Sequence, residues 1–349
     1  MAATETSAAV SVEVTNLSKW YGGFKALDGV SFKIRAGEIV GFLGPNGAGK
    51  TTTMKILTCF LGASGGSAKV AGFDVAEQSM EVRRRVGYLP ETVPLYKDML
   101  VYDYLRFVAE MRGVASDQIQ RSLKDTAEVC GLSNQRMRQP ISELSKGYRQ
   151  RVGLAQALIH KPEVVILDEP TSGLDPNQII EIRDLIKEIG KEKTIIFSTH
   201  ILQEVSAVCD RILILNEGKL LADGTVAQLE AQVRKEELLT LTVGAGSKPL
   251  PSGEQLAEKL RGTGALTLVE PLPSLQGEAS FLVHAKTSTD PRKELFDLAA
   301  QAGLSLLALH RQPMDLEEIF RAYTGDASRV AAESRERARA RVAHANPKE

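Results

Sequence analysis

The sequence predicts two folded parts: an α/β domain with a helical subdomain, followed by a small α+β domain. Three observations predict this fold class. Strand-like and helix-like segments alternate from Val12 to about Thr225. The short apolar runs Val164–Leu167 and Thr194–Phe197 are typical of parallel strands buried on both faces. A glycine-rich segment follows the apolar run Ile39–Leu43 and opens a helix, which gives the order strand, loop, helix.

The helix after the glycine-rich segment is predicted to be amphipathic. Met54, Leu57 and Leu61 recur at the spacing of one helical face, with Ile56 and Phe60 beside them.

A helical subdomain is predicted between about Leu95 and Ile159. Its helices are expected at Tyr102–Arg112, at Asp117–Cys130, and from about Ser145 until Pro162 stops the third. Further along, the apolar run Arg211–Leu215 enters a turn at Asn216–Gly218 and returns as Lys219–Leu221, which predicts a hairpin.

The second part begins after a predicted helix near Val226–Glu236. Its segments are expected as strand Leu238–Val243, helix Gly253–Arg261, strands Ala265–Glu270 and Ala279–Ala285, helix Pro291–Ala302 and strand Leu304–Leu309. This β-α-β-β-α-β order predicts a ferredoxin-like domain, and a last helix, Met314–Tyr323, is expected to pack on it. The predicted boundaries are residues 10–226 and 237–325. Residues 326–349 have almost no large apolar side chain and are predicted to be a disordered tail.

Composition excludes several classes of function. The formal net charge of −1 does not favour nucleic acid as a partner. No apolar run approaches the roughly 20 residues that span a bilayer, so a membrane role is expected to act through another chain. The segment Met1–Ala9 has no basic and no apolar stretch, and is not expected to be a signal peptide. Cys59, Cys130 and Cys209 are odd in number and widely spaced, which indicates free thiols in a reducing compartment.

The glycine-rich segment matches the phosphate-binding pattern G-x-x-x-x-G-K-[ST]. Its glycines let backbone N–H groups turn toward a polyphosphate without Cβ clashes, and the helix that follows presents its positive end to the anion. Lys50 is expected to reach the β- and γ-phosphates, and the Thr51 hydroxyl to bind Mg²⁺. The predicted nucleotide-binding residues are Gly44, Pro45, Asn46, Gly47, Ala48, Gly49, Lys50, Thr51 and Thr52.

Two carboxylates follow the apolar strand Val164–Leu167. Asp168 is expected to hold the Mg²⁺ ion, directly or through water, because the carboxyl end of a central strand lies beside the phosphate loop. Glu169 is expected to act as the general base that polarises the attacking water. The alternative is an acidic pair that only caps the loop after the strand.

The order of motifs resembles the nucleotide-binding subunits of ATP-binding-cassette (ABC) transporters, and the resemblance covers about Val12 to Thr225. The motifs are Tyr21 ahead of Leu27–Ser31, Val86–Glu91 in the place of the Q-loop, Leu144–Arg151 as the signature loop, Ser172–Asp175 as the D-loop, and His200 as the switch histidine. Taken singly, His200 could be a structural histidine and Tyr21 a half-buried strand residue.

The resemblance implies ATP and Mg²⁺ as cofactors, with Tyr21 stacked on the adenine. It also implies a second ATPase subunit, expected to be a second copy, so that two subunits enclose two ATP molecules. In this arrangement Ser145 and Gly147 of one subunit, at a helix N-terminus, face the γ-phosphate held by the other, and Asp175 lies in the D-loop. The catalytic residues expected in this way are Lys50, Glu169 and His200.

Two positions depart from the usual family pattern. Glu91 stands where the Q-loop usually carries glutamine, and its carboxylate could also ligate Mg²⁺. In the signature loop, Lys146 and Tyr148 replace a glycine and a glutamine of LSGGQ. Both departures resemble the exporter subgroup that contains drug, polysaccharide and gliding-motility ATPases.

The resemblance therefore predicts an ATPase that powers an exporter whose polytopic permease is a separate chain. It would lie peripherally on the cytoplasmic face of the inner membrane, with residues Glu91–Asp103 receiving a short permease helix. The C-terminal domain could aid dimerisation or docking, or act as a passive cap. An importer subunit and a soluble ABC mechanoenzyme remain alternatives. Against the second, the chain has neither a long coiled coil nor a second cassette.

Overall fold

The computed structural model describes residues 9–234, 236–247, 250, 255, 258, 266–272, 274, 276–286, 291–312 and 314–325. The chain divides into two compact units, residues 1–226 and 227–349. The predicted tail, 326–349, and most of the predicted helix 253–261 lie outside the described residues. Among the described residues, no helix is both long and apolar enough to cross a membrane.

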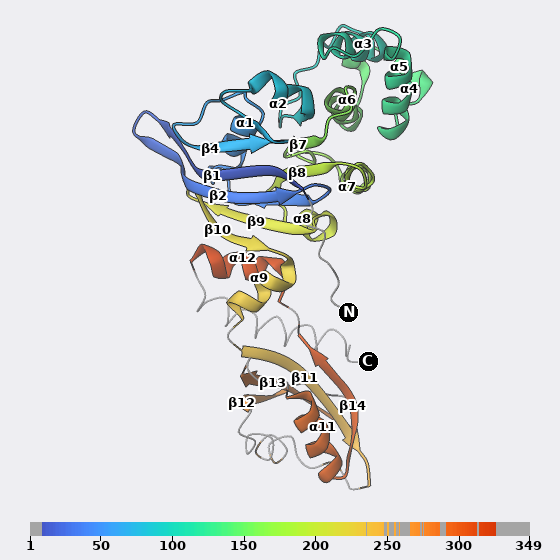
Figure 1. Cartoon of the computed structure of the whole chain (residues 1–349). Coiled ribbons are helices and arrows are strands. Elements are labelled where there is room, and N and C mark those ends of the chain that lie inside the picture. Colours follow the sequence, from blue (N-terminus) through green and yellow to red (C-terminus); the bar gives the residue numbers. More distant parts are fainter. Residues whose placement is uncertain are drawn as a thin grey trace, which may run out of the picture. The chain divides into compact units, whose positions relative to one another are not determined.

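A six-stranded sheet forms the centre of the first unit (Figure 1). In spatial order its strands are β10 (Lys219–Gly224), β9 (Arg211–Asn216), β3 (Ile39–Leu43), β8 (Thr194–Thr199), β7 (Val164–Asp168) and β6 (Val86–Leu89). All neighbouring pairs are parallel except β10 and β9, which form the predicted antiparallel hairpin. The parallel α/β fold class is therefore confirmed.

Both faces of this sheet are buried, because successive side chains of a strand point to opposite faces. In β7, Val164 and Ile166 belong to one apolar core, while Val165 and Leu167 belong to the other. All four side chains are fully buried, which explains why the sequence of this strand is apolar without alternation.

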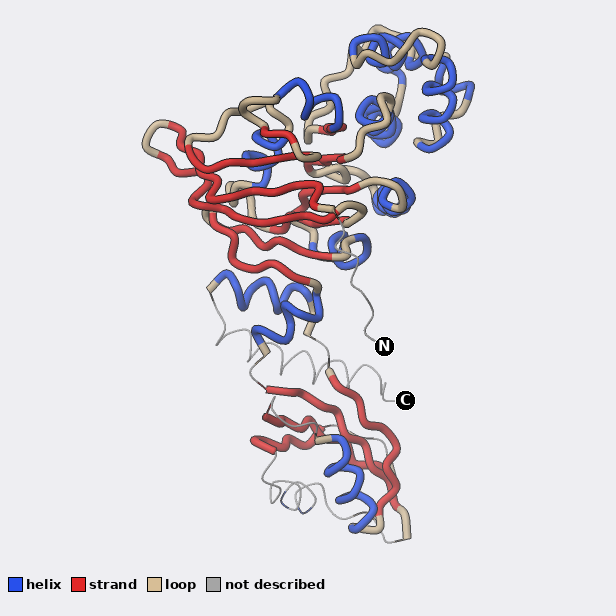
Figure 2. Tube along the Cα trace, viewed as in Figure 1, coloured by secondary structure: helices blue, strands red, loops and turns tan. Residues whose placement is uncertain are grey.

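Helices and a second sheet cover the two cores (Figure 2). The second sheet is antiparallel and has the order β2 (Phe24–Arg35), β1 (Val10–Tyr21), β4 (Gly65–Val70) and β5 (Phe73–Asp74). The helices are α1 (Lys50–Leu57), α2 (Ser79–Arg85), α6 (Lys146–Leu158), α7 (Pro176–Gly190) and α8 (Leu202–Val208). The predicted helical subdomain contains α3 (Val101–Met111), α4 (Ile119–Val129), α5 (Asn134–Met137) and the 3₁₀ turn Ile141–Glu143, and α6 packs against it.

Helix α1 is shorter than the predicted apolar face. It ends at Leu57 because Cys59 adopts a left-handed backbone conformation with φ of 57°, and the N–H groups of Phe60 and Leu61 both turn back to the Lys55 carbonyl. Phe60, which the helical spacing placed beside the apolar face, therefore lies beyond the end of the helix. Its side chain is 75% exposed, whereas Leu57 is fully buried.

The second unit contains a ferredoxin-like sheet. Its elements are α9 (Val226–Val233), β11 (Glu236–Ala245), β12 (Leu266–Leu272), β13 (Glu278–Lys286), α11 (Arg292–Gln301), β14 (Leu304–Arg311) and α12 (Leu316–Thr324). The strand order β12, β13, β11, β14 is antiparallel throughout, as this topology requires. Leu239, Leu241 and Val243 alternate along β11 and are buried in one core with α11.

The last helix, α12, begins two residues later than predicted because Asp315 is its N-cap. The Asp315 carboxylate accepts from the Glu318 N–H, and the Glu318 carboxylate accepts from the Asp315 N–H, which forms a capping box. Hydrogen bonds join α12 to α9: the Tyr323 hydroxyl donates to the Gln232 side chain over 2.6 Å. Helix α12 therefore bonds to α9, an element that lies outside the ferredoxin-like pattern.

Candidate functional site

Three neighbouring parallel strands end at the same edge of the large sheet. The glycine-rich loop follows β3, Asp168 and Glu169 lie at the end of β7, and Ser198 to His200 lie at the end of β8. Strand β8 lies between β3 and β7, so its end lies between the loop and the two carboxylates. The topology therefore gathers residues that are more than 100 positions apart in the sequence.

At two of its glycines the loop passes so close to its neighbours that a side chain is excluded. A Cβ at Gly44 would overlap the Leu215 carbonyl oxygen of β9. Gly49 has φ of 104°, and a Cβ there would lie 2.9 Å from the Ala26 carbonyl oxygen. Only glycine combines this backbone conformation with this close approach. The loop leads directly into α1, whose first N–H groups have no partner inside the helix and can bind an anion.

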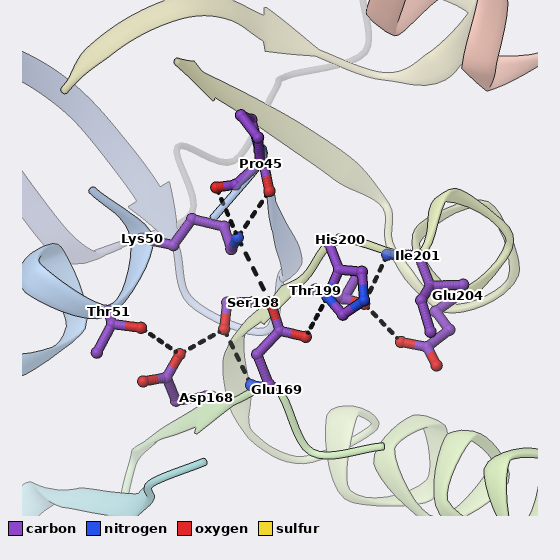
Figure 3. Close-up of polar contacts among 11 residues, drawn as sticks. Pro45, Lys50, Thr51, Asp168, Glu169, Ser198, Thr199, His200, Ile201 and Glu204 are labelled. Carbon is purple, nitrogen blue, oxygen red and sulfur yellow. Dashed lines mark hydrogen bonds and ion pairs between the residues drawn. The ribbon is translucent and has the colours of Figure 1, made fainter. Parts of the chain in front are cut away.

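Lys50, the first residue of α1, holds its amine inside this loop (Figure 3). The amine donates hydrogen bonds to the carbonyls of Gly44, over 2.6 Å, and Pro45, over 3.2 Å. It also lies 3.5 Å from a carboxylate oxygen of Glu169, and both side chains are less than 10% exposed. A cation is thus fixed where the loop, α1 and the end of β7 meet.

Asp168 connects the end of β7 to the start of α1 and to the end of β8. A single carboxylate oxygen, Oδ1, accepts two hydrogen bonds. One comes from the Thr51 hydroxyl of α1, over 3.1 Å, and the second comes from the Ser198 hydroxyl, over 2.6 Å. The Ser198 hydroxyl also accepts from the Glu169 N–H, over 3.0 Å. Asp168 is 1% exposed, so these hydrogen bonds hold a buried carboxylate in a fixed orientation.

Glu169 lies in a strained backbone conformation, with φ of 48°. Such a left-handed conformation is uncommon for residues other than glycine, asparagine and aspartate, and it persists only where the surrounding structure enforces it. Its carboxylate lies between two cationic or polar groups. One oxygen faces the Lys50 amine, and the other is 2.9 Å from Nδ1 of His200. Since an ionised carboxylate only accepts, the hydrogen bond requires a proton on Nδ1.

The residues around Asp168 fit a bound Mg²⁺ ion. Thr51 and Asp168 offer a hydroxyl and a carboxylate oxygen in direct contact. Mg²⁺ typically takes one or two such protein oxygens and completes its six ligands with phosphate oxygens and water. Among the described residues, no three His, Cys, Asp or Glu side chains cluster as a metal site of their own. A Mg²⁺ ion here would therefore depend on the phosphates of a nucleotide.

Comparison with known proteins matches this arrangement to one family. Residues 27–172 match the model of the ABC transporter family. An uncharacterized ABC transporter ATP-binding protein of Methanocaldococcus jannaschii is 42% identical over 219 residues, which is 62% of this chain and 79% of that protein. The linearmycin resistance ATP-binding protein LnrL of Bacillus subtilis is 30% identical over 316 residues, 90% of this chain and 98% of that protein. The chain belongs to the ATP-binding subunits of ABC transporters.

Another relative and a solved structure support the same family. The bacitracin transport ATP-binding protein BcrA of Bacillus licheniformis is 36% identical over 226 residues, 64% of this chain and 72% of that protein. The solved structure of an ATP-binding subunit of an ABC transporter superimposes with a TM-score of 0.58 at 32% identity, covering 63% of this chain and 92% of that one. As a member of this family, the chain binds ATP, is an ATPase and powers transport.

The segments predicted as the signature loop and the D-loop are neighbours. Ser145 is the N-cap of α6 and accepts from the Tyr148 N–H, while Asp175 caps α7 and accepts from the N–H groups of Asn177 and Gln178. A Cβ at Gly147 would lie 2.6 Å from the Gln178 side chain, so the start of α6 touches the start of α7.

Tyr21 and Glu91 take no part in the Lys50–Asp168–Glu169 cluster. Tyr21 ends β1 and is 47% exposed, with the Lys19 amine 5.4 Å from its ring centre. Glu91 is exposed after β6, and no hydrogen bond or ion pair of its side chain occurs in the described part of the chain. Any role of these two residues depends on the nucleotide or on a partner.

Sequence reasoning missed Ser198. Its hydroxyl binds Asp168 and the Glu169 N–H at once, and it faces Asp168 in the pairing of β8 with β7. The sequence did contain a signal for this role, because Ser198 is a polar residue near the end of a buried strand whose central residues are apolar. Thr199 is a second case: its buried hydroxyl donates to Glu204 over 2.8 Å and accepts from the Ile201 N–H, which fixes the turn around His200 (Figure 3).

Proposed function

We propose that this chain is the ATPase subunit of an exporter, acting as a homodimer on a separate polytopic membrane subunit. Its place would be peripheral, on the cytoplasmic face of the inner membrane. The observation that carries the export direction is the match to LnrL, which extends over 98% of that linearmycin resistance protein and, at 90% of this chain, reaches beyond the first unit. BcrA is named for bacitracin transport, which supports a role in transport but gives no direction.

Within the nucleotide site, each residue has a role that its contacts favour. Lys50 neutralises the β- and γ-phosphates, and Thr51 and Asp168 hold Mg²⁺ between them. Glu169 accepts a proton from the attacking water, and its carboxylate is oriented by His200 and by the Lys50 amine. The bound Mg²⁺ would offset the charge that develops on the phosphates. For Tyr21 and Glu91 the family resemblance alone, and no contact with this cluster, suggests the roles: Tyr21 would stack on the adenine, and Glu91 would ligate Mg²⁺.

The second half of each site comes from the other copy in this proposal. Ser145 and Gly147 stand at the N-terminus of a 13-residue helix, where N–H groups and the helix dipole attract an anion. Lys146 adds a positive charge at the same place and is exposed. In the described part of the chain, no hydrogen bond or ion pair joins these three residues to the Lys50–Glu169 cluster. Their ligand in this proposal is the γ-phosphate bound by a second copy.

The permease is proposed to dock on the segment Glu91–Asp103 and the start of the helical subdomain. Tyr96 is 56% exposed in this segment, and its ring lies 5.8 Å from the rings of both Tyr104 and Phe107 on α3. Phe107 is also exposed, whereas Tyr104 is buried. Exposed aromatic side chains such as Tyr96 and Phe107 are enriched at protein interfaces. A structural relative, cbiO1 of Clostridium perfringens, 30% identical, is described as part of an ABC transporter complex.

The test is affinity purification from detergent-solubilised native membranes. The Glu169→Gln variant with ATP should retain its partners, and the Lys50→Ala variant, which is expected not to bind ATP, is the matched control. A polytopic membrane protein recovered in near-equal amount with the first variant is the expected result. Recovery of the chain alone, or with RNA or ribosomes, would contradict the transporter proposal and favour a soluble mechanoenzyme. Transport assays in vesicles of known orientation then separate export from import.

A further inference from the structure

One buried hydroxyl joins Asp168 to Glu169, the two acidic residues at the end of β7 (Figure 3). It belongs to Ser198, which is fully buried near the end of β8. The hydroxyl donates to Oδ1 of Asp168 over 2.6 Å and accepts from the Glu169 N–H over 3.0 Å. Because an N–H only donates, the hydroxyl oxygen accepts from Glu169 and its single hydrogen is left for Asp168. The Ser198 hydroxyl is therefore a bridge with a fixed orientation.

The bridge lies where the pairing of β7 with β8 ends. Asp168 and Ser198 are the last paired residues of the two strands. The N–H of the next residue, Glu169, donates to the Ser198 side chain, and the Glu169 carbonyl accepts from the Ser172 N–H over 3.1 Å. Both backbone polar groups of Glu169 are thus hydrogen-bonded, one on each side of its Cα. These two contacts hold the left-handed φ of 48°, which a glutamate avoids unless its surroundings enforce it.

The backbone of Glu169 decides where its carboxylate lies. With this backbone held, one carboxylate oxygen is 3.5 Å from the Lys50 amine and the other is 2.9 Å from Nδ1 of His200. Alanine at position 198 would remove the side-chain acceptor of the Glu169 N–H, and with it a contact that opposes the strained φ. We expect the backbone then to relax, and the carboxylate to leave its place between Lys50 and His200.

The other partner of the bridge has a second donor. Oδ1 of Asp168 also accepts from the Thr51 hydroxyl, over 3.1 Å, so Asp168 stays tied to α1 when the Ser198 hydroxyl is lost. The hydrogen bonds of the Lys50 amine run to the phosphate loop and do not involve Ser198. Removal of this hydroxyl should therefore affect the position of Glu169 more than the binding of metal or nucleotide.

We propose that Ser198 is a positioning residue for ATP hydrolysis. It holds the backbone of Glu169 and so keeps the carboxylate where it accepts a proton from the attacking water, with Asp168 as the anchor of the bridge. This inference rests on the role proposed for Glu169, and the experiment separates the failure of the two. A buried serine that only satisfies the backbone would instead lower stability and leave hydrolysis by the folded chain unchanged.

Ser198→Ala tests the proposal through kcat and the KM for ATP, measured by steady-state turnover at saturating Mg²⁺. The kcat should fall roughly 10–100-fold, the usual loss when a group that orients a site residue is removed, while the KM stays within about twofold. Ser198→Thr keeps the hydroxyl and should keep kcat within about threefold of the unaltered chain. If Ser198→Ala does not fold, Ser198→Cys takes its place, because a thiol of similar size forms only weak hydrogen bonds.

The matched control is Ser206→Ala, which also removes a serine hydroxyl that is bound within the chain. This hydroxyl is exposed on α8 and donates to the Leu202 carbonyl over 3.1 Å. Its loss should leave both kcat and the KM unchanged.

A double substitution shows which residue Ser198 acts through. Single-turnover hydrolysis by Glu169→Gln and by Glu169→Gln/Ser198→Ala should differ by less than about threefold, because no general base is left to position. A further fall of about tenfold or more in the double variant would overturn the inference, since Ser198 would then act independently of Glu169.

The Mg²⁺ dependence separates this role from metal binding. Ser198→Ala should reach half-maximal turnover at a Mg²⁺ concentration within about threefold of that for the unaltered chain, because Thr51 still holds Asp168. A normal kcat in Ser198→Ala beside an impaired Glu169→Gln would overturn this inference alone. Near-normal hydrolysis by Glu169→Gln would overturn the role proposed for Glu169 and this inference together.

Discussion

Replacing Glu169 by glutamine removes one negative charge from the nucleotide site and leaves its shape almost unchanged. The side chain is 7% exposed and lies between the Lys50 amine, 3.5 Å away, and Nδ1 of His200, 2.9 Å away. Glutamine has the same length and can accept from both groups, but it cannot take a proton from water. Loss of a general base typically lowers the rate by ~10²–10⁴-fold, which corresponds to roughly 3–5 kcal/mol in the activation barrier.

The assay is steady-state ATP turnover, measured beside equilibrium ATP binding. Turnover of Glu169→Gln should fall by at least 100-fold, while binding stays equal or becomes tighter because a negative charge beside the phosphates is gone. Glu163→Gln is the matched control: this carboxylate is 64% exposed, just before the other end of β7, and its loss should leave turnover unchanged. A Glu169→Gln enzyme within threefold of the unaltered rate would refute the general-base assignment.

Three further predictions follow from single contacts. Gly49→Ala should weaken ATP binding and lower the free energy of unfolding by about 1–3 kcal/mol, measured by denaturation, because its Cβ would meet the Ala26 carbonyl at a φ of 104°. Thr51→Val should raise the Mg²⁺ concentration needed for half-maximal turnover, and equal Mg²⁺ dependence would contradict metal binding there. Burial lowers the pKa of His160 to about 4, so the unfolded chain binds more protons below pH 6.5. Stability should therefore fall between pH 6.5 and 4, by about 2 kcal/mol at pH 5, and this fall should be smaller in His160→Gln.

The sequence allowed the parallel sheet and the residues around the phosphate loop to be predicted because their signals are local. A strand buried on both faces is continuously apolar, and the loop needs glycines at fixed places, Gly44 and Gly49 among them. The order of segments in the second unit likewise predicted its ferredoxin-like sheet.

Contacts between distant strands could not be predicted in the same way. Ser198 binds Asp168 because β8 pairs with β7 in the sheet. A single sequence does not reveal which strands are neighbours. The end of α1 depended on the left-handed conformation of Cys59, which exposes Phe60 despite its helical spacing. Arg83 lies in α2 and Arg112 is the C-cap of α3, and only the fold shows that both line one cavity.

The central claim is that two copies of this chain enclose ATP, with Ser145 of one copy completing the site of the other. The most direct measurement is the mass of Glu169→Gln in solution, by light scattering, with and without ATP and Mg²⁺. The account predicts a monomer without nucleotide, a dimer with it, and a monomer again when Ser145→Arg is added to the variant. A chain that remains monomeric at saturating ATP, or a Ser145→Arg chain that still forms the dimer, would contradict it.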